Sequence, residues 1–237
     1  MMNYLQLHLD YLFSKVFFYI TVALLLIIQG SVVYNSMVVE GFSYLDAFRN
    51  QFGYDFLNES FMVSEFVLVF LAILIGINLS SKANQGLMAY SVSSKQTKRH
   101  FILARMMSGI ITILILVLFN QLFIYSFTIV FTPYQINLVE YLRQSGLLFL
   151  EALAYLLMTM VFNAIVQHFM IGFIPIMMFW TIKVTSQNLS QEVNKLIDIF
   201  TININGYLLE EKNILFFIII YIFIQISYII IVIKKDC

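Results

Sequence analysis

The pattern of apolar and polar positions divides this chain into long uncharged runs separated by short charged segments. Three runs carry no charged residue at all, at positions 16–39, 106–139 and 213–233. A single acid interrupts each of two further runs, at 60–81 and 145–182. About 20 consecutive apolar residues in a helix cross a hydrocarbon core about 30 Å thick. The pattern therefore predicts several membrane-spanning helices.

The number of spans depends on how the run at 145–182 is divided. A single helix of that length would rise about 57 Å, nearly twice the thickness of the core. We therefore expect two spans there, joined by a tight turn near 163–168. The chain is then an all-α integral membrane protein with one transmembrane domain, 1–237, and six spans. The predicted spans cover positions 17–38, 61–80, 106–131, 146–165, 169–184 and 214–233.

The first residues, 1–15, have the pattern of an amphipathic helix that lies in the membrane interface. An extension of the first span is the alternative. The apolar positions Leu5, Leu9, Leu12, Phe13 and Val16 share one helical face, and Gln6, His8, Asp10 and Ser14 lie mostly away from it.

Charge distribution predicts the orientation. Six spans put both termini on one side of the membrane, and cytoplasmic segments carry an excess of Lys and Arg. With the termini in the cytoplasm, the inner segments hold eight cations and two acids, whereas the outer segments hold five cations and nine acids. Richness in Ile, Phe, Tyr, Asn and Lys favours a bacterial source. We expect a bacterial plasma-membrane protein with cytoplasmic termini and an extracellular segment at 185–213.

Motifs of enzymes are missing. The chain has no GxxxxGK[ST] loop for nucleotide phosphates, no HExxH zinc motif and no GxSxG nucleophile, and its three histidines lie far apart in sequence. We expect no catalytic residue, no bound metal or cofactor, and no nucleic-acid partner.

The loop at 82–105 between the second and third spans concentrates positive charge. Three cations and a histidine fall within 95–100, with no acid nearby. The cations alone would hold the loop in the cytoplasm and attract anionic lipid. The segment is also helical in pattern, because Phe101, Ile102 and Met106 continue directly into the third span. A contact surface for a partner is therefore the second interpretation.

The stretch LMAYSVSSKQTKRHFILAR resembles the coupling loop of the permease subunit of ABC-2-type exporters, and the order of segments along the whole chain is similar. Val92 or Ser93 replaces the usual proline, and Arg105 takes the place of a lysine. The resemblance implies a type V-like permease architecture with a coupling helix that seats on a separate ATPase. The implied ATPase-coupling residues are Ser91, Ser93, Ser94, Lys95, Lys98, Arg99, His100 and Arg105.

The resemblance also implies partners. They are two ABC ATPase subunits that bind ATP and Mg²⁺, a second permease that is identical or related, and membrane lipid. The chain has 24 Phe, 14 Tyr and 12 Met and almost no charge in the middle of its spans, which favours an amphipathic or apolar cargo. Within the family this indicates a peptide toxin, a bacteriocin or a phenol-soluble-modulin-like peptide. A membrane immunity or sensor subunit without transport and the substrate-binding subunit of a vitamin importer are the alternatives.

Four amide side chains fall near the middle of predicted spans: Gln29, Asn120, Gln121 and Gln225. Buried amides in lipid form interhelical hydrogen bonds of about 0.6–2 kcal/mol each. We expect these residues to contact one another or to line a transport path. Glu65 and Glu151 lie near the outer ends of their spans, where we expect them to reach lipid headgroups.

Overall fold

The computed structural model describes residues 2–13, 16–39, 46–80, 95–132 and 134–166, together with positions 174, 226 and 230. Within these residues the chain forms α-helices and no strand, so the all-α prediction is confirmed for this part of the chain. The helices are α1 (Met2–Phe13), α2 (Val16–Val39), α3 (Asp46–Leu79), α5 (Lys95–Phe131) and α6 (Leu138–Val166).

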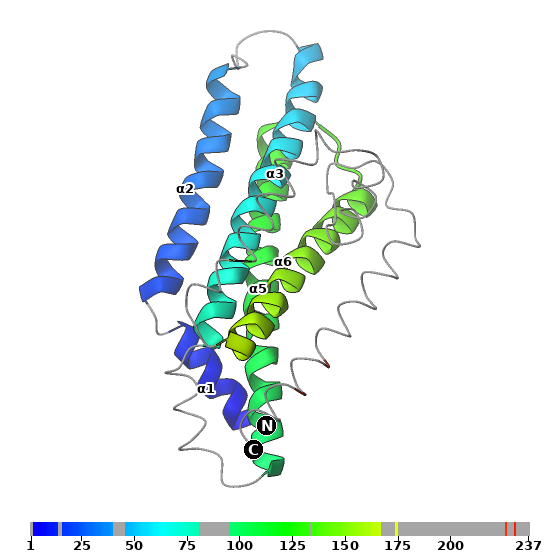
Figure 1. The fold of residues 1–237 in the computed structure, drawn as a ribbon. Helices are drawn as coiled ribbons and strands as arrows, with labels where there is room; N and C mark the ends of the chain where they lie inside the picture. The colour runs from blue at the N-terminus through cyan, green and yellow to red at the C-terminus, as the bar shows by residue number, and fades with distance from the viewer. Residues whose placement is uncertain are drawn as a thin grey trace, which may run out of the picture.

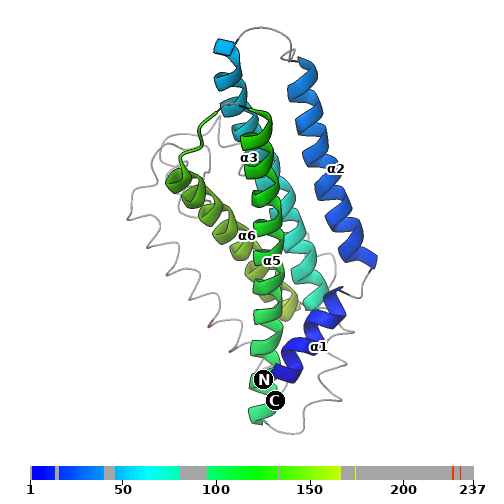
Figure 2. The same ribbon diagram turned by 180° about the vertical axis from the view of Figure 1, so that it is seen from behind.

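The four longer helices form a bundle in which the chain direction alternates (Figure 1). Helix α3 packs against each of the other helices, α5 and α6 lie along it with α6 at a tilt, and α2 lies on the outside against α3. Helix α1 lies across one end of the bundle, beside the first turns of α5, as the opposite view also shows (Figure 2). The N-terminal helix and the start of α5 are therefore at the same end of the molecule.

Three helices contain stretches long and apolar enough to cross a membrane: Phe56–Leu79, Arg99–Phe131 and Leu138–Ile165. Helix α2 contributes the shorter apolar stretch Val22–Ser31. These helices contain the predicted spans at 61–80, 106–131 and 146–165, and α2 contains the one at 17–38. The described part of the chain is thus membrane-embedded and helical.

The remaining predicted segments lie outside the described residues. They are the spans at 169–184 and 214–233 and the extracellular segment at 185–213. The count of six spans and the exporter-permease architecture therefore stay predictions.

Two helices begin earlier than their apolar runs. The apolar run of the second predicted span begins at position 61, but α3 already begins at Asp46. The next predicted span begins at position 146, but α6 already begins at Leu138. The Asn137 side chain caps α6, because its Oδ1 accepts hydrogen bonds from the backbone N–H groups of Val139 and Glu140, at 3.2 and 3.4 Å. Both helices thus extend beyond their apolar runs into segments with charged residues.

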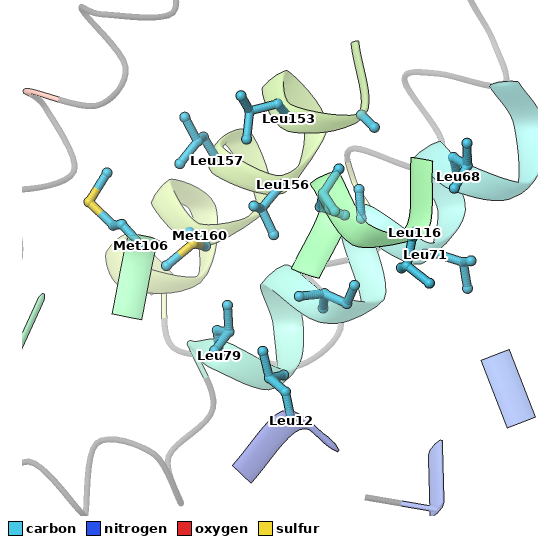
Figure 3. Packing of buried hydrophobic residues seen from close by; sticks show 14 of the residues in the cluster. Leu12, Leu68, Leu71, Leu79, Met106, Leu116, Leu153, Leu156, Leu157 and Met160 are labelled. Carbon is cyan, nitrogen blue, oxygen red and sulfur yellow. The ribbon is translucent and has the colours of Figure 1, made fainter. Parts of the chain in front are cut away.

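Leucine and methionine side chains fill the space between the helices (Figure 3). Leu79 of α3, Met106 of α5 and Leu156 and Met160 of α6 lie in one buried cluster, and Leu12 reaches it from α1. Lipid tails are as apolar as these side chains, so close packing and dispersion contribute more to helix association here than the hydrophobic effect does.

Helices α3 and α6 approach each other closely at Gly76. A Cβ added there would lie 2.9 Å from the backbone oxygen of Leu156 and 3.0 Å from the Cβ of Thr159. A backbone oxygen cannot move aside as the end of a flexible side chain can. Glycine at this position therefore sets the spacing of the two helices.

We predict that Gly76→Ala destabilises the bundle by about 1–3 kcal/mol, the usual cost of overpacking. Thermal unfolding in lipid nanodiscs measures the change. Gly30→Ala and Gly146→Ala are matched controls, because a Cβ at either position meets nothing within 4 Å. These controls should keep or raise the melting temperature, since alanine is the better helix former by about 1 kcal/mol. Equal behaviour of all three variants would contradict the close packing of α3 on α6.

Candidate functional site

Three helices meet at a buried group of neutral polar side chains, Gln29 of α2, Ser64 of α3 and Asn120 of α5, which we call the polar triad. Gln29 Nε2 donates to Ser64 Oγ at 2.7 Å and to Asn120 Oδ1 at 3.1 Å. Asn120 Nδ2 donates to Ser64 Oγ at 2.7 Å, and the Ser64 hydroxyl in turn donates to the backbone carbonyl of Ser60. The three side chains therefore form a closed ring of hydrogen bonds.

The triad is shielded from the surroundings of the protein, with exposed fractions of 2% for Gln29 and 0% for Ser64 and Asn120. Polar groups buried in an apolar medium are costly unless they are hydrogen-bonded. Each member therefore depends on the other two, and the ring ties α2 to α3 and α5.

The structure brings together two of the four predicted amide residues, Gln29 and Asn120. The third partner, Ser64, was missed from the sequence. A signal was present, because Ser60 and Ser64 lie four residues apart on one face of an apolar helix. Gln225 lies outside the described residues.

Gln121 follows Asn120 in α5 but joins a different contact. Its Oε1 accepts a hydrogen bond from Ser145 Oγ at 3.2 Å, and its backbone carbonyl accepts one from the Tyr141 hydroxyl at 2.6 Å. Both donors belong to α6. Gln121 therefore connects α5 to α6, whereas Asn120 connects α5 to α2 and α3.

The basic stretch forms the first turns of α5, which begins at Lys95 and continues into the apolar part of the helix without interruption. Arg99 is exposed and His100 is half-buried. The expected coupling residues Ser91, Ser93 and Ser94 lie outside the described residues, as do the side chains of Lys95 and Lys98.

Arg105 differs from Arg99 and His100 because it is buried. Its exposed fraction is 2%, and its guanidinium carbon lies 5.2 Å from the centre of the Phe101 ring. A buried guanidinium over an aromatic face contributes a cation–π interaction of about 2 kcal/mol. In this arrangement Arg105 holds the end of the bundle together and does not lie on a surface that a partner can contact.

Helix α1 docks on the same turns of α5. Phe101 makes edge-to-face contacts with Tyr4, at 5.6 Å between ring centres, and with His8, at 4.6 Å. The Tyr11 hydroxyl donates to Asn78 Oδ1 of α3 at 3.3 Å.

His8 was expected to lie away from the buried face of α1, and this prediction is wrong. His8 is fully buried, and Leu12 is buried as well. The Phe101 ring packs on Tyr4 and His8, so this face of α1 lies against α5. Burial and, secondarily, the positive charge of Arg105 lower the pKa of His8 to about 4. The imidazole is therefore neutral at physiological pH.

The two acids in the spans are also placed differently from expectation. Glu65 of α3 and Glu151 of α6 are buried, and both interact electrostatically with Tyr155. Tyr155 in turn packs against Val69 and Ile73 of α3. The prediction that the carboxyl groups reach lipid headgroups is wrong, because α6 packs along α3 at this level and encloses them. Within the described ranges, no three metal-binding side chains gather closely enough to hold an ion.

Comparison with known proteins gives no identification: no family model matches the chain, and no curated protein is a match to it.

We predict energetic coupling between Gln29 and Asn120. Gln29→Leu and Asn120→Leu should each lower thermal stability in nanodiscs, and the double variant should lose less than the sum, with a coupling energy of about 0.6–1.7 kcal/mol. Gln121→Leu is the matched control for Asn120→Leu, because Gln121 bonds to α6 and not to Gln29. Full additivity of Gln29→Leu and Asn120→Leu would show that the triad does not hold the helices together.

Proposed function

We propose that the chain is the permease subunit of an ATP-driven exporter in a bacterial plasma membrane. In the proposed complex it pairs with a second permease, identical or related, and with two ATPase subunits that bind ATP and Mg²⁺. The cargo is an amphipathic or apolar molecule, and a peptide toxin, bacteriocin or cytolytic peptide fits the composition of the spans. Both termini face the cytoplasm.

The observation that carries the proposal is the continuity of α5. Its exposed basic end, with Arg99, and its polar middle, with Asn120, belong to one helix. The two residues are separated by about 32 Å at 1.5 Å per residue. A helix packed on both sides moves as a unit, so force applied to the basic end reaches the polar triad. An exporter needs such a connection between the ATPase and the transport path.

The contact with α1 supports the same proposal. Because Tyr4 and His8 pack on Phe101, α1 holds the basic turns of α5 in a fixed direction. A segment that served only to attract lipid through its charge would not need a defined direction.

The neutral character of the triad supports the choice of cargo. Its three side chains carry no charge, so this part of the bundle suits an uncharged or amphipathic molecule better than a polyanion.

We predict that Lys98→Glu combined with Arg99→Glu removes the ATPase activity that co-purifies with the tagged chain from native membranes. Reversed charge at the basic end should repel an acidic groove on the partner, most strongly at low salt, because exposed charges are screened within about 8–10 Å at physiological salt. Arg143→Glu is the matched control. Arg143 is an exposed cation in the first turns of α6, at the opposite end of the bundle, and pairs only with exposed Glu140 among the described residues.

Insertion must be monitored in the same experiment, because cations also determine topology. Cys237 should stay protected from a membrane-impermeant thiol reagent in intact cells. If the doubly reversed variant inserts correctly and retains its ATPase, the basic end is not the coupling surface. A chain that brings no ATPase with it even in its native form would contradict the exporter proposal as a whole.

A further inference from the structure

Among the described residues, the buried serine and threonine hydroxyls follow one rule, with one exception. A buried serine or threonine in an apolar helix commonly donates its hydroxyl hydrogen to a backbone carbonyl three or four residues earlier. Ser60 is fully buried, but its Oγ has no hydrogen-bond partner within the described part of the chain. The buried hydroxyl residues that follow the rule are Ser64, Ser80, Ser108, Thr112, Thr128, Thr132 and Thr159.

A second unmatched atom lies in the polar triad itself. Gln29 Oε1 is buried and accepts no hydrogen bond from the described residues. Turning the amide would not correct this, because the oxygen would then face Asn120 Oδ1, which is also an acceptor. In the orientation that gives the triad its hydrogen bonds, the Gln29 oxygen is therefore unmatched.

The two residues that carry the unmatched atoms are both hydrogen-bonded to Ser64. Ser64 Oγ accepts from Gln29 Nε2 and donates to the backbone carbonyl of Ser60. Ser60 is thus joined to Ser64 through its backbone carbonyl, and its unmatched Oγ belongs to the same residue, one helical turn before Ser64. An unmatched buried acceptor is destabilising, and the hydrocarbon of a membrane offers no bulk water to satisfy it.

We propose that the junction of α2, α3 and α5 is a binding site for a small neutral group that donates a hydrogen bond to Gln29 Oε1 and exchanges one with Ser60 Oγ. An N–H or O–H group has this chemistry. The polar side chains of the network are all uncharged, which favours a neutral ligand over an ion. A resident water and the amide or hydroxyl of an amphipathic solute share this chemistry.

The position of α2 gives a solute a route to the site. Tyr19, Ile20, Leu24 and Ile27 of α2 are exposed, whereas Leu25 and Gln29 are buried. Helix α2 therefore contacts the bundle along a narrow stripe, and a small displacement of α2 opens the junction. The inference does not depend on ATP-driven export, and the two proposals fail under different results.

The sign of the effect of Ser60→Ala on stability tests the proposal in the full chain in lipid nanodiscs. If Ser60 Oγ binds a ligand, the variant loses a hydrogen bond, and we expect the melting temperature to fall by about 2–4 °C. If the hydroxyl were simply desolvated, its removal would raise the melting temperature. Ser108→Ala is the matched control, because its hydroxyl is bonded to the Arg105 carbonyl. An increase for Ser60→Ala overturns the proposal.

Two measurements on the unaltered chain identify the source of the donor. Octanamide carries an N–H donor, and methyl octanoate has a similar chain without one. A rise in melting temperature with octanamide alone, lost in Ser60→Ala, assigns the site to a solute. A nuclear Overhauser contact between water and the Gln29 side-chain amide, with no effect of either probe, assigns it to a resident water. The absence of both results overturns the proposal, whatever the variant does.

Discussion

An unbroken ladder of backbone hydrogen bonds along α5 is the constraint on which the rest of the described structure depends. No proline interrupts the 37 residues from Lys95 to Phe131. Gly109 is the one glycine in the helix, and a Cβ there would lie 2.9 Å from Leu79 Cδ1 and 3.0 Å from Leu156 Cδ2. Gly109 therefore allows α3 and α6 to pack closely on α5. Helix α5 remains straight enough to contact other helices along its length.

Each other helix is positioned through contacts with α5 or with helices packed on it. Helix α1 docks on Phe101 at the exposed basic end, and α2 is linked through the hydrogen bond from Gln29 to Asn120. Helix α6 is linked through Gln121 at the adjacent position. Because neighbouring residues of one helix point in different directions, Asn120 joins α5 to α2 and α3, and Gln121 joins it to α6.

Hydropathy predicted four of the helical stretches in the described part of the chain, and it could not predict the other features of this part. The early start of α6, with Asn137 as its cap, depends on a local hydrogen bond outside the apolar run. The burial of His8 depends on an aromatic partner nearly a hundred residues away in sequence. Gln29 and Asn120 were recognisable as amides in lipid, whereas Ser64 and the enclosure of Glu151 follow from the way the helices cross. Such tertiary contacts leave little periodicity in the sequence.

The distance between spin labels at Leu103 and Leu122 tests the continuity of α5 most directly. Both side chains are exposed on α5, one near the basic end and one beyond the polar triad. Nineteen residues of continuous helix separate their backbones by about 28 Å. In nanodiscs, pulsed electron resonance should give one narrow distribution near that distance, unchanged when ATP is added to the native complex. A broad or two-peaked distribution would show that α5 bends between its two ends and would contradict the mechanical connection.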